Sequence, residues 1–163
     1  MSKVIVGVMG PGDDARAEAI AAAHELGRLI AMEGWVLLTG GRALGVMDAA
    51  CKGAKDGGGL TVGVLPSLDT AGMSDAIDIP IVTGMGQARN NINVLSSRLV
   101  IACGIGAGTV SEVALALKAG KKVILLKFSE EGIALFKSLS KDEVFVASQP
   151  REAITIAKVL VED

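Results

Sequence analysis

Three glycines stand at a predicted turn from a strand to a helix, where their backbone could bind an anion. The turn, Gly104-Ile105-Gly106-Ala107-Gly108-Thr109, follows an apolar run from Leu99 to Cys103 and leads into a helical pattern. Glycine lets a backbone approach an anion closely, and the first turn of a helix offers unpaired N–H groups at its positive end. One helix end supplies only about 0.3–1 kcal/mol, whereas a dissociation constant of about 1 μM needs about 8 kcal/mol. We therefore expect other loops to converge on the same point.

Thr109 and Glu112 also have the spacing of a capping box, in which two side chains bond backbone N–H groups at the start of a helix. In that interpretation both residues only stabilise the helix after the glycine turn. In the other interpretation they face a ligand bound at the same helix end. The sequence leaves both interpretations open for Glu112.

The other glycine turns do not match the known nucleotide-binding motifs. The segment Gly7-Val8-Met9-Gly10-Pro11-Gly12 lacks the spacing of the dinucleotide fingerprint, and Thr39-Gly40-Gly41 stands where that fingerprint expects an acidic residue. No lysine follows a glycine turn at the position that nucleoside triphosphatases require. The sequence therefore disfavours NAD and nucleoside triphosphates as ligands.

The composition is that of one aliphatic domain. The 163 residues have the length of a single domain, which we place at residues 1–163, and 50% of them are hydrophobic while only 2% are aromatic. With so many aliphatic residues, we expect some apolar surface to lie between subunits. No run reaches the roughly 18 apolar residues that span a bilayer, and no signal-peptide pattern is present. We expect a cytoplasmic protein without a membrane partner.

Charge, cysteine and histidine content disfavour several other classes of site. The 16 basic and 18 acidic residues nearly balance, so a nucleic-acid partner is not expected. Cys51 and Cys103 have no further ligand at metal-binding spacing and are predicted to be small buried residues. His24, the single histidine, lies in the middle of a predicted helix, far from the glycine turns. We therefore expect neither a protein-bound metal nor a histidine-activated nucleophile.

Short β-rich runs alternate with longer helical patterns along the whole chain. The runs are almost continuously apolar, which is typical of parallel strands covered by helices on both faces. The sequence predicts a Rossmann-like, doubly wound α/β fold with a mostly parallel sheet of about seven strands. The predicted strands are Val4–Met9, Trp35–Thr39, Leu60–Leu65, Ile79–Val82, Leu99–Cys103, Lys122–Leu126 and Val144–Val146. The predicted helices are Asp14–Glu33, Gly45–Asp56, Gln87–Ser97, Thr109–Ala119, Glu131–Leu139 and Gln149–Val161.

Two arginines stand on turns that this fold gathers at one edge. In doubly wound sheets ligands bind beyond the carboxyl ends of the strands, and Arg42 and Arg89 both follow such ends. Arg89 is predicted to lie in the first turn of a helix, where a cation opposes the helix dipole. A bound anion, or the carboxylate of Glu112, would explain a cation there.

The paired arginine helix and glycine-rich turn ending in Thr-x-x-Glu resemble the LOG and lysine decarboxylase-like superfamily, which is related to DprA and shares a Rossmann-like fold. The chain is more similar still to the molybdenum cofactor carrier proteins. That similarity is carried by Val8–Gly12, Trp35–Arg42, Asp78–Asn93 and Gly106–Thr109, and it extends from Val4 to about Leu126.

The resemblance to LOG enzymes implies one function and also marks departures from it. Those enzymes are phosphoribohydrolases that cleave nucleoside 5'-monophosphates with an arginine and a glutamate, whose positions Arg89 and Glu112 match. The chain has Gly104 and Ile105 where the LOG motif has Pro and Gly, and Asn90 where lysine usually follows the arginine. A phosphate-binding frame is thus expected, with phosphoribohydrolase activity as the alternative function.

The resemblance to the carriers implies a homotetramer that binds, protects and delivers molybdenum cofactor without converting it. A molybdoenzyme such as nitrate reductase would receive the cofactor. The resemblance places the cofactor's phosphate at the helix end near Thr109, with Arg42 or Arg89 as counter-charge, and phosphate, sulfate, molybdate or tungstate could occupy the same site. The candidate subunit interface is formed by the helices Gln87–Ser97, with Ile92, Val94 and Leu95, and Val110–Ala119.

Aromatic residues are too few to sandwich a pterin ring. Only Phe128, just after a predicted strand, is an aromatic candidate for the edge of the sheet where the ligand would bind. Recognition is therefore expected to rest on glycine backbone and polar side chains. The candidate cofactor-binding residues are Gly10, Gly12, Gly40, Gly41, Arg42, Arg89, Asn90, Gly104, Gly106, Ala107, Gly108, Thr109, Ser111 and Glu112.

Overall fold

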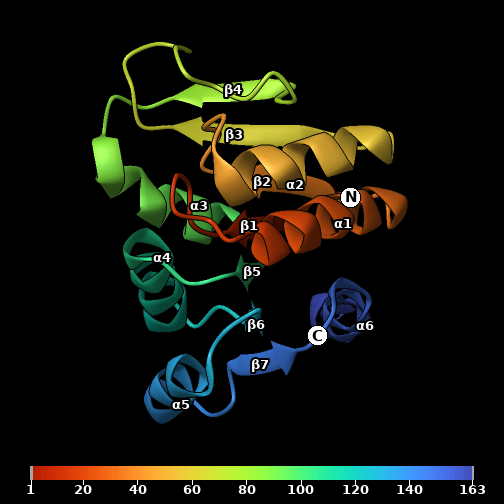
Figure 1. Cartoon of the computed structure of the whole chain (residues 1–163), viewed down its shortest axis with the longest axis vertical. Helices are drawn as coiled ribbons and strands as arrows, with labels where there is room; N and C mark the ends of the chain where they lie inside the picture. Colours follow the sequence, from red (N-terminus) through yellow and green to blue (C-terminus); the bar gives the residue numbers. More distant parts are fainter. Residues whose placement is uncertain (1, 163) are drawn as a thin grey trace.

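The computed structural model describes residues 2–162, so Met1 and Asp163, the two ends of the predicted domain, lie outside the described residues. The strands are β1 (Ile5–Met9), β2 (Val36–Thr39), β3 (Thr61–Leu65), β4 (Ile79–Val82), β5 (Leu99–Cys103), β6 (Val123–Leu126) and β7 (Val144–Ala147). All of them pair in parallel into one sheet, with the order β4-β3-β2-β1-β5-β6-β7 (Figure 1). The predicted parallel sheet is confirmed, and no predicted strand end is wrong by more than one residue.

Helices cover both faces of the sheet, as predicted. They are α1 (Ala17–Met32), α2 (Gly45–Asp56), α3 (Asn90–Ser96), α4 (Ala107–Lys118), α5 (Glu130–Leu139) and α6 (Pro150–Glu162), with a short 3-10 helix, η1 (Gly86–Arg89). Buried apolar residues of α1, α2 and α6 form one core cluster with the strands, and those of α3, α4 and α5 form a second cluster on the other face (Figure 1). This two-sided burial explains why the strands are apolar at successive positions.

The direction in which the chain winds reverses between β1 and β5. From β1 the chain adds β2, β3 and β4 on one side, and from β5 it adds β6 and β7 on the other. β1 and β5 are neighbours, with Met9 paired to Ala102 near their carboxyl ends. Because the connections leave these two strands toward opposite faces, their loops diverge and open a crevice at this edge.

Three predicted helix starts differ from the structure by two residues or more. α1 begins at Ala17 rather than Asp14, because residues 12–15 form a turn closed by a hydrogen bond from the Ala15 amide to the Gly12 carbonyl oxygen. α4 begins at Ala107, with Gly106 in extended conformation before it, rather than at Thr109. The helix predicted to begin at Gln87 begins as the 3-10 helix η1, and α3 follows from Asn90 with Arg89 as its N-cap residue. Arg89 therefore lies at the start of an α-helix, as predicted.

β4 is an edge strand that follows β3 without an intervening helix, and its four residues are exposed. The connecting segment, residues 66–78, lies along the loop after β2: the Ala43 amide donates to the Gly72 carbonyl oxygen, and the Ser74 amide donates to that of Gly41, each at 2.9 Å. These contacts hold the backbone on both sides of Arg42. No helix in residues 2–162 is long and apolar enough to cross a membrane.

The cysteines and the histidine lie where the sequence predicts. Cys51 and Cys103 are fully buried free thiols, and burial raises their pKa values to about 11 and about 12. His24 is partly exposed on α1, and its Nε2 lies 2.8 Å from a carboxylate oxygen of Asp56. All three residues have packing or surface contacts that account for them.

Candidate functional site

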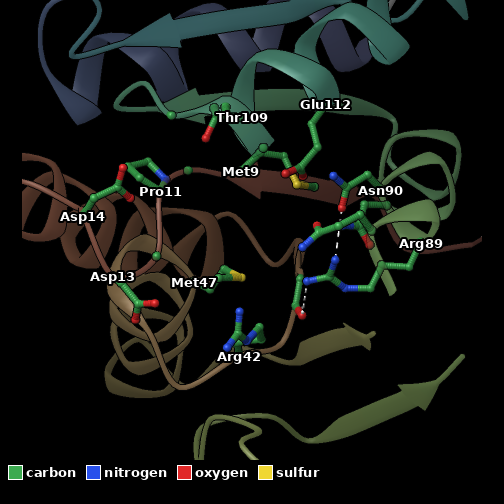
Figure 2. A pocket seen from close by; sticks show the side chains of 18 residues that line it. Met9, Pro11, Asp13, Asp14, Arg42, Met47, Arg89, Asn90, Thr109 and Glu112 are labelled. Carbon is green, nitrogen blue, oxygen red and sulfur yellow. Dashed lines mark hydrogen bonds between the residues drawn. The ribbon is translucent and has the colours of Figure 1, made fainter. Parts of the chain in front are cut away.

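A cavity of about 380 Å³ opens at the edge of the sheet where the winding reverses. Its walls come from the loops after β1 and β2, from η1 and α3, and from the first turns of α4 (Figure 2). Eleven of the fourteen candidate binding residues line it: Gly10, Gly12, Gly40, Arg42, Arg89, Asn90, Gly106, Ala107, Gly108, Thr109 and Glu112. The structure thus brings together segments that are up to about a hundred residues apart in sequence.

Three candidate residues and the aromatic candidate lie elsewhere. Gly104 lines a neighbouring pocket, and the buried Gly41 accepts the Ser74 amide through its carbonyl oxygen. The Ser111 hydroxyl donates to the Gly108 carbonyl oxygen at 2.7 Å. Phe128 packs edge to face on Phe136, with ring centroids 6.1 Å apart, and it does not line this cavity.

Arg89 is held in the cavity wall by backbone oxygens of β3 and of the residue that follows β2. Arg89 is 96% buried, and its Nε donates to the Val64 carbonyl oxygen at 2.8 Å. Its Nη2 donates to the Gly40 carbonyl oxygen at 3.3 Å (Figure 2). Gly40 permits this approach, because a Cβ there would lie 3.0 Å from Nη2. The expected ion pair with Glu112 is not among the salt bridges of residues 2–162, and Arg89 instead bonds to the sheet edge.

Two guanidinium groups share the cavity. Arg42 is exposed on the loop after β2 and points into the cavity in Figure 2. Burial is the largest effect that lowers the pKa of Arg89; the charge of Glu112 opposes it, and the charge of Arg42 adds to it. Within residues 2–162 neither arginine has a carboxylate within salt-bridge distance. The cavity therefore holds positive charge that an anionic group could pair with.

The start of α4 offers hydrogen-bond donors to the same cavity. Gly106 precedes the helix and no side chain caps it, so the capping-box interpretation of Thr109 and Glu112 is wrong. The first backbone bond of the helix joins the Val110 amide to the Gly106 carbonyl oxygen, which leaves three earlier N–H groups ahead of it. The Thr109 hydroxyl is buried and has no hydrogen-bond partner among the described residues. A buried hydroxyl without a partner is costly, and a bound ligand would remove that cost.

Glu112 is the carboxylic acid with the most altered environment in the site. Its side chain is 91% buried on α4, and Figure 2 shows it directed toward Met9 and Asn90. Burial raises its pKa to about 7, although the charge of Arg89 and the side chain of Asn93 act in the opposite direction. Glu112 can therefore hold or release a proton near neutral pH.

Residues 3–154 match the SLOG cluster4 family over nearly the whole chain. The chain belongs to this family. It is 58% identical to the molybdenum cofactor binding protein of the phototrophic bacterium Rippkaea orientalis, covering 99% of both chains with a TM-score of 0.97. It is 54% identical to the molybdenum cofactor carrier protein of Chlamydomonas reinhardtii, covering 99% of this chain and 100% of that one with a TM-score of 0.95.

This SLOG cluster4 protein is also similar, more distantly, to a protein that is named as an enzyme. It is 31% identical over 100 residues to the cytokinin riboside 5'-monophosphate phosphoribohydrolase of Mycobacterium tuberculosis. The match covers 60% of this chain and 53% of that enzyme, about half its length. The resemblances to carrier proteins and to LOG-related enzymes are thus confirmed, and the carriers are much the more similar.

Asn90 differs from the lysine that usually follows the arginine in LOG enzymes, and the structure gives it a role in the SLOG cluster4 protein. Its Oδ1 accepts a hydrogen bond from Arg89 Nη1 at 3.1 Å, and its Nδ2 donates to the Ser111 hydroxyl at 3.3 Å. Asn90 therefore links the buried guanidinium to the first turns of α4. A lysine side chain has no acceptor for the first of these bonds.

Sequence reasoning missed seven residues that line the cavity of this SLOG cluster4 protein: Met9, Pro11, Asp13, Asp14, Met47, Gln87 and Asn93. Asp13 and Asp14 follow the Gly10-Pro11-Gly12 turn directly. Their place beside a turn at the predicted ligand-binding edge of the sheet could have identified them. Asn93 gave no comparable signal, because only the structure shows that its neighbour Val94 lies in the core. Residues 2–162 contain no group of three or more His, Cys, Asp or Glu side chains that could hold a metal ion.

Proposed function

We propose that the chain binds molybdenum cofactor and carries it without chemical conversion. The observation that carries this proposal is the buried Arg89, which lines one cavity with Arg42, the unpartnered Thr109 hydroxyl and the free N–H groups of α4. These groups suit the terminal phosphate of the cofactor, since helix N-termini and arginines are preferred phosphate ligands. High identity to two proteins named for binding or carrying this cofactor supports the same ligand.

The cavity also suits the rest of such a ligand. In addition to the two arginines, the cavity wall offers hydrogen-bond acceptors on Asp13, Asp14 and Glu112. Molybdenum cofactor combines a phosphate with a pterin whose ring carries N–H donors, so acceptors and cations are both needed. Met9 and Met47 add apolar, polarisable surface to the wall. The molybdenum is cargo held by the cofactor's own dithiolene sulfurs.

We propose further that the chain forms a homotetramer. The sequence placed Val94 in the interface, but Val94 is fully buried in the core and is unavailable for it. Leu95 on α3 is 52% exposed, and Ile79, Ile81 and Val82 on the edge strand β4 are each more than 40% exposed. Light scattering at micromolar concentration tests this proposal: a mass of four chains supports it, and a monomer contradicts it.

A second candidate function is hydrolysis of a nucleoside 5'-monophosphate. It is favoured by the pKa of about 7 at Glu112, which suits a general acid, and by the carboxylates of Asp13 and Asp14 in the same cavity. We rank it second, because Asn90 replaces the lysine of LOG enzymes.

Protection of the cofactor tests the carrier proposal. Molybdenum cofactor is released from a molybdoenzyme into air, with this protein or with serum albumin at the same concentration, and the surviving cofactor is assayed over time. A carrier prolongs the survival of the cofactor well beyond albumin. Equal decay in the two samples would rule out the proposed function.

A further inference from the structure

Two polar side chains on the α3 and α4 side of the cavity are buried without hydrogen-bond partners, and a carboxyl group is buried beside them. Asn93 is 99% buried, and neither its amide nitrogen nor its amide oxygen has a hydrogen-bond partner among the described residues. The Thr109 hydroxyl is in the same situation. Glu112, beside them on α4, is 91% buried. All three line the same cavity, which Figure 2 shows from close by.

The fold does not explain why these residues are polar. Asn93 stands next to Val94, which is fully buried in the apolar core, and α3 packs directly on α4. An apolar residue at position 93 would fill such a place without an unpaired amide. Arg89, the neighbouring cation, donates its hydrogen bonds to Val64, Gly40 and Asn90 rather than to Glu112. The unpaired groups are therefore available to a ligand.

We propose that Asn93 and Glu112 together recognise a 2-amino-4-oxopyrimidine edge, in which a ring N–H and an exocyclic amino group lie side by side. The Glu112 carboxylate accepts one hydrogen bond from each of these two donors, because its two oxygens match their spacing. The Asn93 amide, which can donate and accept, bonds the adjacent ring carbonyl or nitrogen. This inference rests on the proposed function, since the pterin of the cofactor has this edge, and it assigns the end of the ligand opposite the phosphate.

Recognition by Glu112 makes binding depend on pH. The charged group that acts on Glu112 is Arg89 on η1, and Asn93 faces it from α3; Arg42 and the aspartates at 13 and 14 line the same cavity from the loops after β2 and β1. With its pKa raised to about 7 by burial, Glu112 is only partly ionised at neutral pH. Two N–H donors select the ionised carboxylate, so affinity for the ring rises as pH rises through about 7.

The test uses free pterin, which is fluorescent and has no phosphate, against lumazine, which has a carbonyl in place of the amino group. Protein is titrated into each compound up to millimolar concentration, one pH unit below the pKa of about 7 and at that pKa, because both compounds begin to lose a ring N–H at higher pH. We expect pterin to bind about tenfold or more tightly than lumazine, the effect of one hydrogen bond to a charged group. Pterin, but not lumazine, should bind more tightly at the higher pH.

Variants separate this site from general effects on the fold. Glu112→Gln keeps the shape of the side chain and should remove both the preference for pterin and its pH dependence. Asn93→Ala should weaken pterin binding, whereas Asn91→Ala, the matched change at an exposed residue of α3, should leave it unchanged. Thermal melts of each variant show whether it is folded.

The outcomes distinguish this inference from the proposed function. Wild-type protein that does not bind pterin, or binds pterin and lumazine equally at both pH values, overturns the inference even if it still protects the whole cofactor. A preference for pterin that survives Glu112→Gln overturns it as well. If the protein prefers pterin through Glu112 but gives no protection to the cofactor, the inference stands and the carrier function fails.

Discussion

The guanidinium of Arg89 and the carbonyl oxygen of Val64, separated by 25 positions in sequence, are joined by a 2.8 Å hydrogen bond at the edge of the sheet. This bond ties the wall of the cavity to the carboxyl end of β3. It also means that Arg89 supports the fold in addition to any role toward a ligand. Arg42, which is exposed on the neighbouring loop, has no comparable structural role, so the two arginines should respond differently to substitution.

Arg89→Ala should destabilise the protein, whereas Arg42→Ala should not. The first change leaves the Val64 and Gly40 carbonyl oxygens without their donor, which costs about 1–3 kcal/mol. The second removes an exposed side chain, for which changes stay within about 0.5 kcal/mol. Urea unfolding of both variants beside the wild type measures the difference. Equal stability of the two variants would contradict the structural role of Arg89.

Glu112→Gln should stabilise the ligand-free protein at high pH. Folding raises the pKa of Glu112 from 4.5 to about 7, so between these values the folded state holds more protons than the unfolded state. Its contribution to stability therefore falls as pH rises through this window, by about 3 kcal/mol at most. The variant has no carboxyl group at this position, so its stability does not fall in this way as pH rises. Urea unfolding at about pH 5 and about pH 8 should show the stability gap widening with pH in favour of the variant. A constant gap would show that the pKa of Glu112 is not raised.

Phosphate, sulfate, molybdate or tungstate should bind at the start of α4. The N–H groups of residues 107–109 precede the first backbone bond of the helix, and the Thr109 hydroxyl beside them has no partner among residues 2–162. Crystals soaked in each anion provide the measurement, with tungstate the easiest to locate. Density along residues 106–111 is expected. Anion density elsewhere in the cavity, with this turn empty, would show that the site is misplaced.

The protein should lack appreciable phosphoribohydrolase activity. Asn90 holds Arg89 Nη1 through its amide oxygen, where LOG enzymes usually have lysine, so the environment of this arginine differs from theirs. Incubation with AMP and with cytokinin ribotides, followed by chromatography of the free base, measures the activity. Release at about 1 s⁻¹ or faster, abolished by Glu112→Ala, would favour the enzyme instead.

The sheet and its edge could be predicted from sequence because their signals are local. Continuous apolar runs mark the strands, glycine-rich turns mark their ends, and the winding rule places those ends together. β4 shows the limit of this reasoning. Its residues Ile79 and Ile81 are as apolar as those of the central strands, yet they are exposed, because an edge position is decided by the topology and not by composition.

The details of the site depend on contacts that a sequence does not show. Arg89 is buried by carbonyl oxygens 25 and 49 positions away, so its sequence neighbours gave no sign of them. The start of α4 was misplaced because Gly106 provides no capping side chain, while Thr109 and Glu112 imitate a capping box. The unpartnered amide of Asn93 becomes evident only when α3 is packed against α4.

Cofactor retention and transfer test the central claim most directly. Wild type, Arg42→Ala and Arg42→Glu are loaded with molybdenum cofactor, freed of excess by gel filtration, and mixed with cofactor-free nitrate reductase, whose regained activity is measured. We expect the wild type to restore activity. Arg42→Ala should retain about tenfold less cofactor, as for one lost hydrogen bond to a charged group. Arg42→Glu should retain less still, because its carboxylate repels the phosphate. Equal retention by all three proteins would contradict the phosphate site, and no retention by the wild type would contradict the carrier function itself.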